Sequence, residues 1–75
     1  MPASNLLTIR LHPSDNVVVS RAELLPGTMV GEEDVATVEV IPTSHKLAVR
    51  PIARGAAVRK YNQIIGFATA DIPAG

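Results

Sequence analysis

The sequence predicts a small all-β domain built from short strands that bend at glycine-centred corners. Apolar and polar residues alternate over short stretches, which is the period-two pattern of half-buried strands. No apolar pattern with the period of a helix continues for three helical turns. Proline, glycine and an Asn-Gln pair separate the candidate strands, so each strand is expected to be short.

The first candidate strands lie on either side of a tight turn. In residues 6–11 the side chains of Leu7, Ile9 and Leu11 share one face, and we expect that face to be the buried one. Turn-forming residues at 12–16 then lead into a second strand at 17–20. Residues 21–25 are long enough for one helical turn, but the following Pro-Gly pair ends it, so we expect a bent connection.

The remaining strands are expected at residues 28–30, 35–41, 46–49, 56–61 and 64–70. The stretch 35–41, VATVEVI, alternates most clearly, and its Thr37 and Glu39 are expected to face water or a sheet edge. The acidic run Glu32-Glu33-Asp34 before it is expected to be a solvated surface loop.

A short repeat predicts where the sheet turns. Each copy begins with an aliphatic residue and has a glycine three positions later, with Ser44 replacing the glycine in one copy. The copies begin at Leu24, Ile41, Ile52 and Ile72. We expect the aliphatic residue to lie in the core and the glycine to supply a positive φ. The last copy stops at its glycine, so we expect the chain to be a fragment or a small subunit of a larger protein.

Composition limits the architecture and the partners. A chain of 75 residues is expected to form one domain, spanning residues 1–75. Domains of this size bury only about 60% of their unfolded surface, so we expect a homo-oligomer or a larger host protein. Only 3% of the residues are aromatic, and the core must therefore consist of Val, Ile, Leu and Ala.

Charge and cysteine content exclude several classes of protein. Seven basic and seven acidic residues give a formal net charge of zero, so neither nucleic acid nor an anionic membrane is an expected partner. The absence of cysteine excludes disulfides, thiolate-bound zinc and thiol catalysis. The first ten residues do not resemble a signal peptide, and no apolar stretch approaches the roughly 20 residues of a membrane span. We expect a soluble, cytoplasmic protein.

His45 and Lys46 are the best candidates for chemistry. An imidazole titrates near neutral pH and can move a proton, and an ammonium group can hold a carboxylate. The alternative is that a single histidine in a loop has only a structural role.

Two further pairs are weaker candidates. Lys60 and Tyr61 can bind a carboxylate and a hydroxyl, but a Lys-Tyr pair at a strand end is also typical of a surface lysine beside a half-buried ring. Asp15 and Asn16 are typical turn residues that can also contact a ligand or a metal. His12, which precedes a proline, is expected to be structural. No arrangement of residues supplies three convergent metal ligands with recognisable spacing, so no metal is expected on this chain alone.

Five ordered blocks, which span nearly the whole chain, resemble a known family. The blocks are Leu11-His12-Pro13-Ser14-Asp15-Asn16-Val17, Ile41-Pro42-Thr43-Ser44-His45-Lys46-Leu47-Ala48, Pro51-Ile52-Ala53-Arg54-Gly55-Ala56-Ala57-Val58-Arg59-Lys60-Tyr61, Ile65-Gly66 and Asp71-Ile72-Pro73-Ala74-Gly75. In their order and spacing they resemble the SAF domain found at the N-terminus, or as the small subunit, of altronate and galactarate dehydratases. The family has glycine where this chain has Ser44 and Asn62. Asn tolerates a left-handed backbone, whereas Ser is less suited to it.

The resemblance implies a β-clip fold and a place in an enzyme that removes water from a sugar acid to give a 2-keto-3-deoxy product. From their side-chain chemistry, we expect His45 to be the catalytic residue and Lys46, Lys60, Tyr61, Asp15 and Asn16 to bind substrate, and the resemblance strengthens the case for His45 and Lys46. A partner is implied too, namely the catalytic large domain or subunit of the dehydratase. Such chemistry needs a base, an acid and usually a cation, so the complete enzyme is expected to hold iron, manganese or magnesium.

The same resemblance implies that the chain does not catalyse alone. Relatives continue beyond the closing glycine into a His-Thr-His-Asn-like segment, so the site on this chain is expected to be incomplete. The alternative function is a non-catalytic carbohydrate-binding, oligomerisation or assembly module, because related domains serve in such roles.

Overall fold

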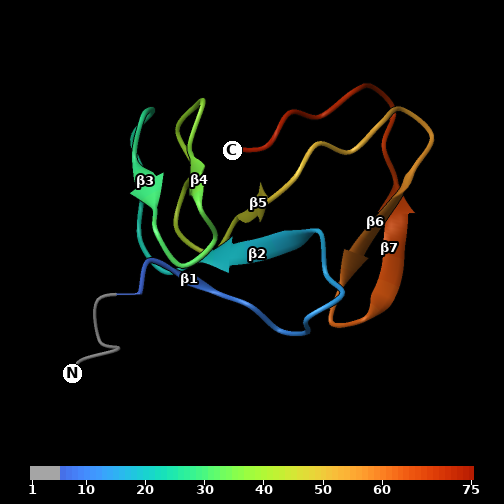
Figure 1. Cartoon of the computed structure of the whole chain (residues 1–75), viewed down its shortest axis with the longest axis horizontal. Coiled ribbons are helices and arrows are strands. Elements are labelled where there is room, and N and C mark those ends of the chain that lie inside the picture. Colours follow the sequence, from blue (N-terminus) through green and yellow to red (C-terminus); the bar gives the residue numbers. More distant parts are fainter. Residues whose placement is uncertain (1–5) are drawn as a thin grey trace.

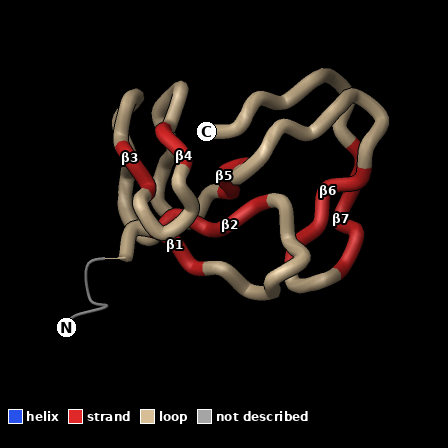
Figure 2. The backbone as a smooth tube through the Cα atoms, viewed as in Figure 1, coloured by secondary structure: helices blue, strands red, loops and turns tan. Residues whose placement is uncertain are grey.

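A computed structural model describes residues 6–75, and this part of the chain contains seven short strands and no helix (Figures 1 and 2). The strands are β1 (Thr8–Ile9), β2 (Val17–Ser20), β3 (Met29–Val30), β4 (Val35–Ala36), β5 (Lys46–Ala48), β6 (Ala57–Lys60) and β7 (Gln63–Phe67). They form a three-stranded antiparallel sheet in the order β1-β2-β5 and two antiparallel pairs, β3-β4 and β6-β7. The predicted all-β fold class is confirmed. The β-clip assignment stays a prediction, and the predicted domain also includes residues 1–5, which lie outside the described part.

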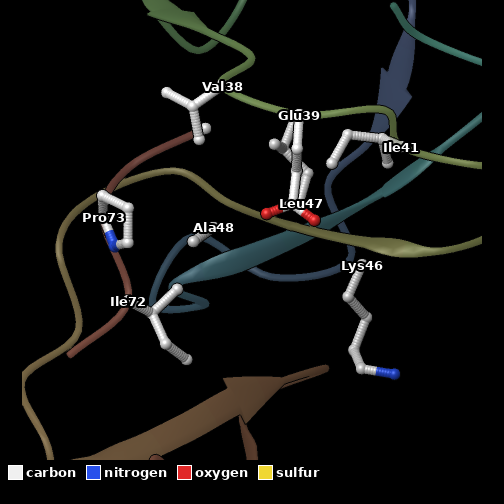
Figure 3. A pocket seen from close by; sticks show the side chains of 9 residues that line it. Val38, Glu39, Ile41, Lys46, Leu47, Ala48, Ile72 and Pro73 are labelled. Atoms are coloured by element: carbon white, nitrogen blue, oxygen red, sulfur yellow. The ribbon is translucent and has the colours of Figure 1, made fainter. Parts of the chain in front are cut away.

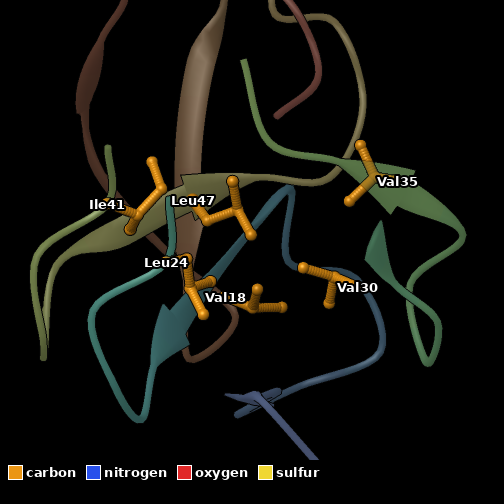
Figure 4. Close-up of a cluster of buried hydrophobic side chains, with 6 residues drawn as sticks. All are labelled: Val18, Leu24, Val30, Val35, Ile41 and Leu47. Atoms are coloured by element: carbon orange, nitrogen blue, oxygen red, sulfur yellow. The ribbon is translucent and has the colours of Figure 1, made fainter. Parts of the chain in front are cut away.

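Strand β2 lies in the middle of the molecule, with β3 and β4 on one side and the β6–β7 hairpin on the other (Figure 1). Successive side chains of a strand point to opposite faces, so β2 packs against both sides. Val18 belongs to a buried cluster that includes residues of β3 and β4. Val17 belongs to a second buried cluster with Ala48, Ile52 and Ala68. The first cluster comprises Val18, Leu24, Val30, Val35, Ile41 and Leu47 (Figure 4). This double packing explains why the adjacent residues Val17 and Val18 are both apolar.

The predicted repeat is a structural unit. Its four aliphatic residues pair in twos through antiparallel bridges, Leu24 with Ile41 and Ile52 with Ile72. The residue three positions later has a positive φ in every copy: 82° at Gly27, 70° at Ser44, 85° at Gly55 and 93° at Gly75. Type II turns require this conformation at their third residue. The prediction that glycine supplies a positive φ is therefore confirmed, and Ser44 adopts the same conformation without being a glycine.

The β6–β7 hairpin closes through a two-residue loop, Tyr61-Asn62. Lys60 pairs with Gln63 in the register, so only these two residues connect the strands. Their φ values are 56° and 58°, as in the type I′ turns that match the twist of hairpin strands. Asn62 adopts the left-handed backbone predicted for it. Tyr61 does so as well, although it is neither Gly nor Asn.

Two expectations about which residues face the core are wrong. In β1, Thr8 is 3% exposed and Ile9 is 47% exposed, so the predicted facing is reversed. The reason is that Thr8 donates through both its backbone N–H (3.0 Å) and its Oγ1 (2.9 Å) to the Glu32 carboxylate. Thr37, which was expected to face water, is buried because its Oγ1 donates to the Leu25 carbonyl and accepts from the Thr28 N–H.

Two expected elements also differ from the structure. The strand predicted at residues 35–41 is limited to β4, with a single further bridge at Ile41. The acidic run is not simply a solvated loop, since Glu32 binds β1 and Glu33 forms an ion pair with Arg10 at 2.7 Å. In both cases the groups are satisfied by partners distant in sequence: Val38 N–H donates to the backbone carbonyl of Gly75, and the two glutamates bind β1 and Arg10. Strand β2 matches its predicted range, whereas β1, β3, β5 and β6 lie within their predicted ranges but are shorter. Strand β7 begins one residue before the predicted range of 64–70 and ends three residues before its end.

Candidate functional site

His45 and Lys46 lie where the second copy of the repeat, which begins at Ile41, leads into β5. The backbone holds this point firmly, because the His45 N–H donates to the Pro42 carbonyl (3.0 Å) and its carbonyl accepts from the Ser20 N–H (2.9 Å). Both side chains are exposed. Within residues 6–75, neither side chain forms a hydrogen bond or an ion pair. The imidazole and the ammonium are thus free to act on something outside this part of the chain.

Lys46 also lines a cavity of about 190 Å³ (Figure 3). The lining residues are Val38, Glu39, Ile41, Lys46, Leu47, Ala48, Ile72, Pro73 and Gly75. All but the first two come from the blocks at residues 41–48 and 71–75, which therefore meet around one cavity. The Lys46 ammonium lies apart from the Glu39 carboxylate, and the two form no ion pair (Figure 3). The cavity walls are mainly apolar, and the two charged residues that line the cavity are Lys46 and Glu39.

Asp15 and Asn16 bind the β6–β7 hairpin. The two Asp15 carboxylate oxygens accept hydrogen bonds from the backbone N–H groups of Tyr61 and Asn62, each at 2.7 Å. The Asn16 amide donates to the Ala57 carbonyl (2.9 Å) and accepts from the Arg59 N–H (2.8 Å). The two side chains thus hold the hairpin from its tip to the start of β6.

The charge of Asp15 is stabilised where it lies. Burial by itself would raise the pKa of this carboxyl group, but the N–H groups of Asn62 and Tyr61 and the positive charge of Arg10 outweigh burial and hold the pKa below its ordinary value. Hydrogen bonds to a charged carboxylate are stronger than those to a neutral acceptor, so they stabilise a turn with positive φ values more. Asp15 therefore offsets part of the strain at the hairpin tip.

Two polar residues near the tip, Ser14 and Arg10, were not identified from the sequence. The Ser14 hydroxyl donates to Asn62 Oδ1 and lies 2.8 Å from His12 Nδ1. Arg10 donates to the carbonyls of His12, Pro13 and Asp15 and binds Glu33. No local sequence signal reveals these contacts, except that several turn formers follow His12. The predicted structural role of His12 agrees with its hydrogen bonds.

The predicted site residues fall into two groups at opposite ends of β2. Asp15 and Asn16 directly precede Val17, and they hold the tip that carries Lys60 and Tyr61. Lys46 instead pairs with Val19, near the other end of the strand. Because alternate side chains share a face, Lys46 lies on the same sheet face as Ala48, the face that packs toward β6 and β7. Tyr61 is exposed and Lys60 half-buried.

No cluster of three potential metal ligands lies within the described part of the chain. Among residues 6–75, no three His, Asp or Glu side chains gather closely enough to hold a metal ion. The same residues include no helix long and apolar enough to cross a membrane.

Comparison with known proteins identifies the family. Residues 6–75 match the family model described as the altronate/galactarate dehydratase SAF domain. This chain belongs to that family.

Two curated relatives show how much of an enzyme the SAF domain represents. Over 69 residues, 89% of this chain, it is 44% identical to altronate dehydratase of Escherichia coli (strain K12). It is 33% identical to galactarate dehydratase (L-threo-forming) of the same organism, also over 69 residues and 89% of the chain. The aligned region covers only 14% and 13% of these proteins. The SAF domain thus corresponds to a small part of each relative.

Proposed function

We propose that this SAF domain contributes to the substrate site of a sugar-acid dehydratase and does not catalyse alone. The observation that carries the proposal is the cavity beside Lys46, because the two blocks that form most of it are also blocks on which the family resemblance rests. Lys46 provides a cation there with no partner among residues 6–75. The substrate class follows from the two relatives, whose names give altronate and galactarate, both of them sugar acids.

Each residue has a role that matches its position. The Lys46 ammonium binds a substrate carboxylate, and His45 moves a proton, since both side chains are exposed and adjacent on one rigid turn. Lys60 and Tyr61 bind a carboxylate or hydroxyl group from the hairpin tip. In this proposal Asp15 and Asn16 act through the hairpin, because their polar groups are already engaged by its backbone.

The rest of the reaction depends on the larger part of the enzyme. Dehydration beside a carboxylate requires a second acid or base and usually a cation that stabilises the enediolate. Since residues 6–75 hold no cluster of metal ligands, we derive no step through a metal on this chain. Iron, manganese or magnesium bound by the catalytic part of the dehydratase completes the proposal.

The test uses the assembled dehydratase, with its catalytic part on the same chain or on a separate one. Replacing Lys46→Met should lower kcat/KM for altronate or galactarate by roughly tenfold to a hundredfold, the range for a lost hydrogen bond to a charged group. Replacing His45→Gln should lower kcat by about a hundredfold or more, as expected for a general acid or base. Arg54→Met is the matched control, since it removes an exposed positive charge that does not line the cavity. Unchanged kinetics in both test variants would rule out the proposed roles.

A non-catalytic carbohydrate-binding module is the alternative. It predicts that the separate domain binds sugar acids without the catalytic part and that the assembled enzyme tolerates His45→Gln. Calorimetric titration of altronate and galactarate into the 75-residue chain distinguishes this case from ours, in which appreciable binding requires the catalytic part.

A further inference from the structure

The outer strand of the β6–β7 hairpin carries large apolar side chains that nothing in the described structure covers. Ile64 is 49% exposed, Ile65 48% and Phe67 65%. Phe67 pairs with Ala57 and Ile64 pairs with Arg59. Ala57 and Arg59 are two residues apart in β6, so Ile64 and Phe67 share a face. A register irregularity between Val58 and Arg59 leaves Ile65 without a paired residue. Such a bulge re-aims side chains, and it places both isoleucines at the surface.

The two strands of this hairpin have different outer edges. The outer edge of β6 is occupied by the Asn16 amide, which binds the Ala57 carbonyl and the Arg59 N–H as a neighbouring peptide group would. Strand β7 pairs only with β6, and within residues 6–75 its other edge receives no backbone or side-chain hydrogen bond. An apolar edge strand of this kind favours pairing or aggregation unless something covers it.

A two-stranded pair is marginally stable in water unless a further layer packs on it. Here the second core cluster supports the hairpin from one side, where the half-buried Val58 packs against that cluster. Phe67 pairs with Ala57, the neighbour of Val58, and so points to the opposite side. The hairpin is thus supported on one face and apolar on the other, as is typical of a surface that a second body covers.

We infer that β7, through Ile64, Ile65 and Phe67, is the surface on which the catalytic part of the dehydratase docks. The inference rests on the proposed function, which supplies that partner. Its size follows from the relatives, since about six-sevenths of each lies outside the region matched here. The hairpin carries Arg59 and Lys60 and no acidic residue, so the partner surface is apolar at its centre and acidic at its rim. Docking there would place the catalytic part beside the tip that carries Lys60 and Tyr61.

The inference can be tested by photo-crosslinking in the assembled dehydratase. One variant carries p-benzoylphenylalanine in place of Phe67, and the control carries it in place of Met29, which lies in β3 and is similarly exposed at 60%. Crosslinked peptides are identified by mass spectrometry, and substrate turnover is measured on the same preparations. We expect position 67 to crosslink to residues of the catalytic part with a severalfold higher yield than position 29.

Two results would overturn the inference: crosslinks from position 67 that lead to a second copy of this domain, or a yield no higher than at position 29. A second measurement needs no crosslinking residue, and it therefore tests the inference even when p-benzoylphenylalanine disturbs assembly of the enzyme. In the enzyme with natural residues, the backbone amides of β7 should exchange with solvent severalfold more slowly than they do in the 75-residue chain, and equal exchange would also contradict docking. Turnover reports separately on the proposed function, because an enzyme that crosslinks as expected but dehydrates no sugar acid refutes only the function.

Discussion

Gly75 should be much less tolerant of a side chain than the other glycines of the repeat. All have a positive φ, which costs a non-glycine residue about 1 kcal/mol. At Gly27 and Gly55 an added Cβ atom meets nothing within 4 Å, whereas at Gly75 it would overlap the carbonyl oxygen of Ala36. Relief requires a backbone shift that breaks the hydrogen bonds from Gly75 N–H to Ala48 and from Val38 N–H to Gly75, each worth about 1 kcal/mol. Gly75→Ala should therefore cost about 3 kcal/mol.

The comparison with Gly55→Ala isolates the cost of the overlap with Ala36. Both substitutions lower the entropy of the unfolded chain equally, so this effect cancels in their difference, which should be about 2 kcal/mol. Urea denaturation of the two alanine variants measures this difference. Hydrogen exchange provides a second readout, because the Val38 amide should lose its protection in Gly75→Ala and keep it in Gly55→Ala. Equal free energies of unfolding for the two variants would refute the argument from the overlap with Ala36.

Three further predictions concern the polar groups that hold the fold. The pKa of Asp15 and that of Glu32 are held below their ordinary values of 3.8 and 4.5, so their contributions to stability are present above these values and are lost as pH falls through the lower folded-state pKa. Glu32→Gln and Asp15→Asn should each flatten the acid limb of a plot of stability against pH. An unaltered acid limb in both variants would contradict this sign. Thr37→Val should destabilise the domain by about 1–3 kcal/mol in urea denaturation, because it removes a buried hydrogen-bond donor to the Leu25 carbonyl and an acceptor for the Thr28 N–H. A cost below about 0.5 kcal/mol would mean that these hydrogen bonds contribute little to stability. Asn16→Leu should release the outer edge of β6, so the backbone amide of Arg59 should exchange its hydrogen with solvent severalfold faster, while the amide of Val18 changes less. Equal changes at both amides would indicate general unfolding instead of local release.

The sequence predicts those parts of the fold that depend on neighbouring residues. In all four copies of the repeat, the glycine or serine three positions after the aliphatic residue has a positive φ. The interrupted alternation predicts short strands in the correct order. The sequence does not show that the copies pair in twos, Leu24 with Ile41 and Ile52 with Ile72, because this pairing depends on contacts between distant segments.

The errors arise where a polar group is satisfied from far along the chain. Thr8 is buried because Glu32 reaches it across 24 positions, and no local pattern distinguishes a threonine with such a partner from one that faces water. For the same reason Asp15 and Asn16 were identified as turn residues and candidate ligands, while their contacts with residues more than 40 positions away were not foreseen. Whether His45 and Lys46 act on a substrate stays a prediction, since the groups that would face them lie outside the described chain.

The position of Asp15 clarifies how the hairpin tip could serve a substrate. Both oxygens of its carboxylate are engaged by backbone N–H groups, so it holds the tip without using the side chains of Lys60 and Tyr61. Those two side chains therefore remain available for contacts outside the domain, on a turn whose backbone is fixed beforehand. Pre-organisation of this kind reduces the entropy lost when a ligand binds. If the tip contacts substrate, Asp15→Asn in the assembled enzyme should raise KM more than it lowers kcat, whereas a direct proton-transfer role for Asp15 would require the opposite.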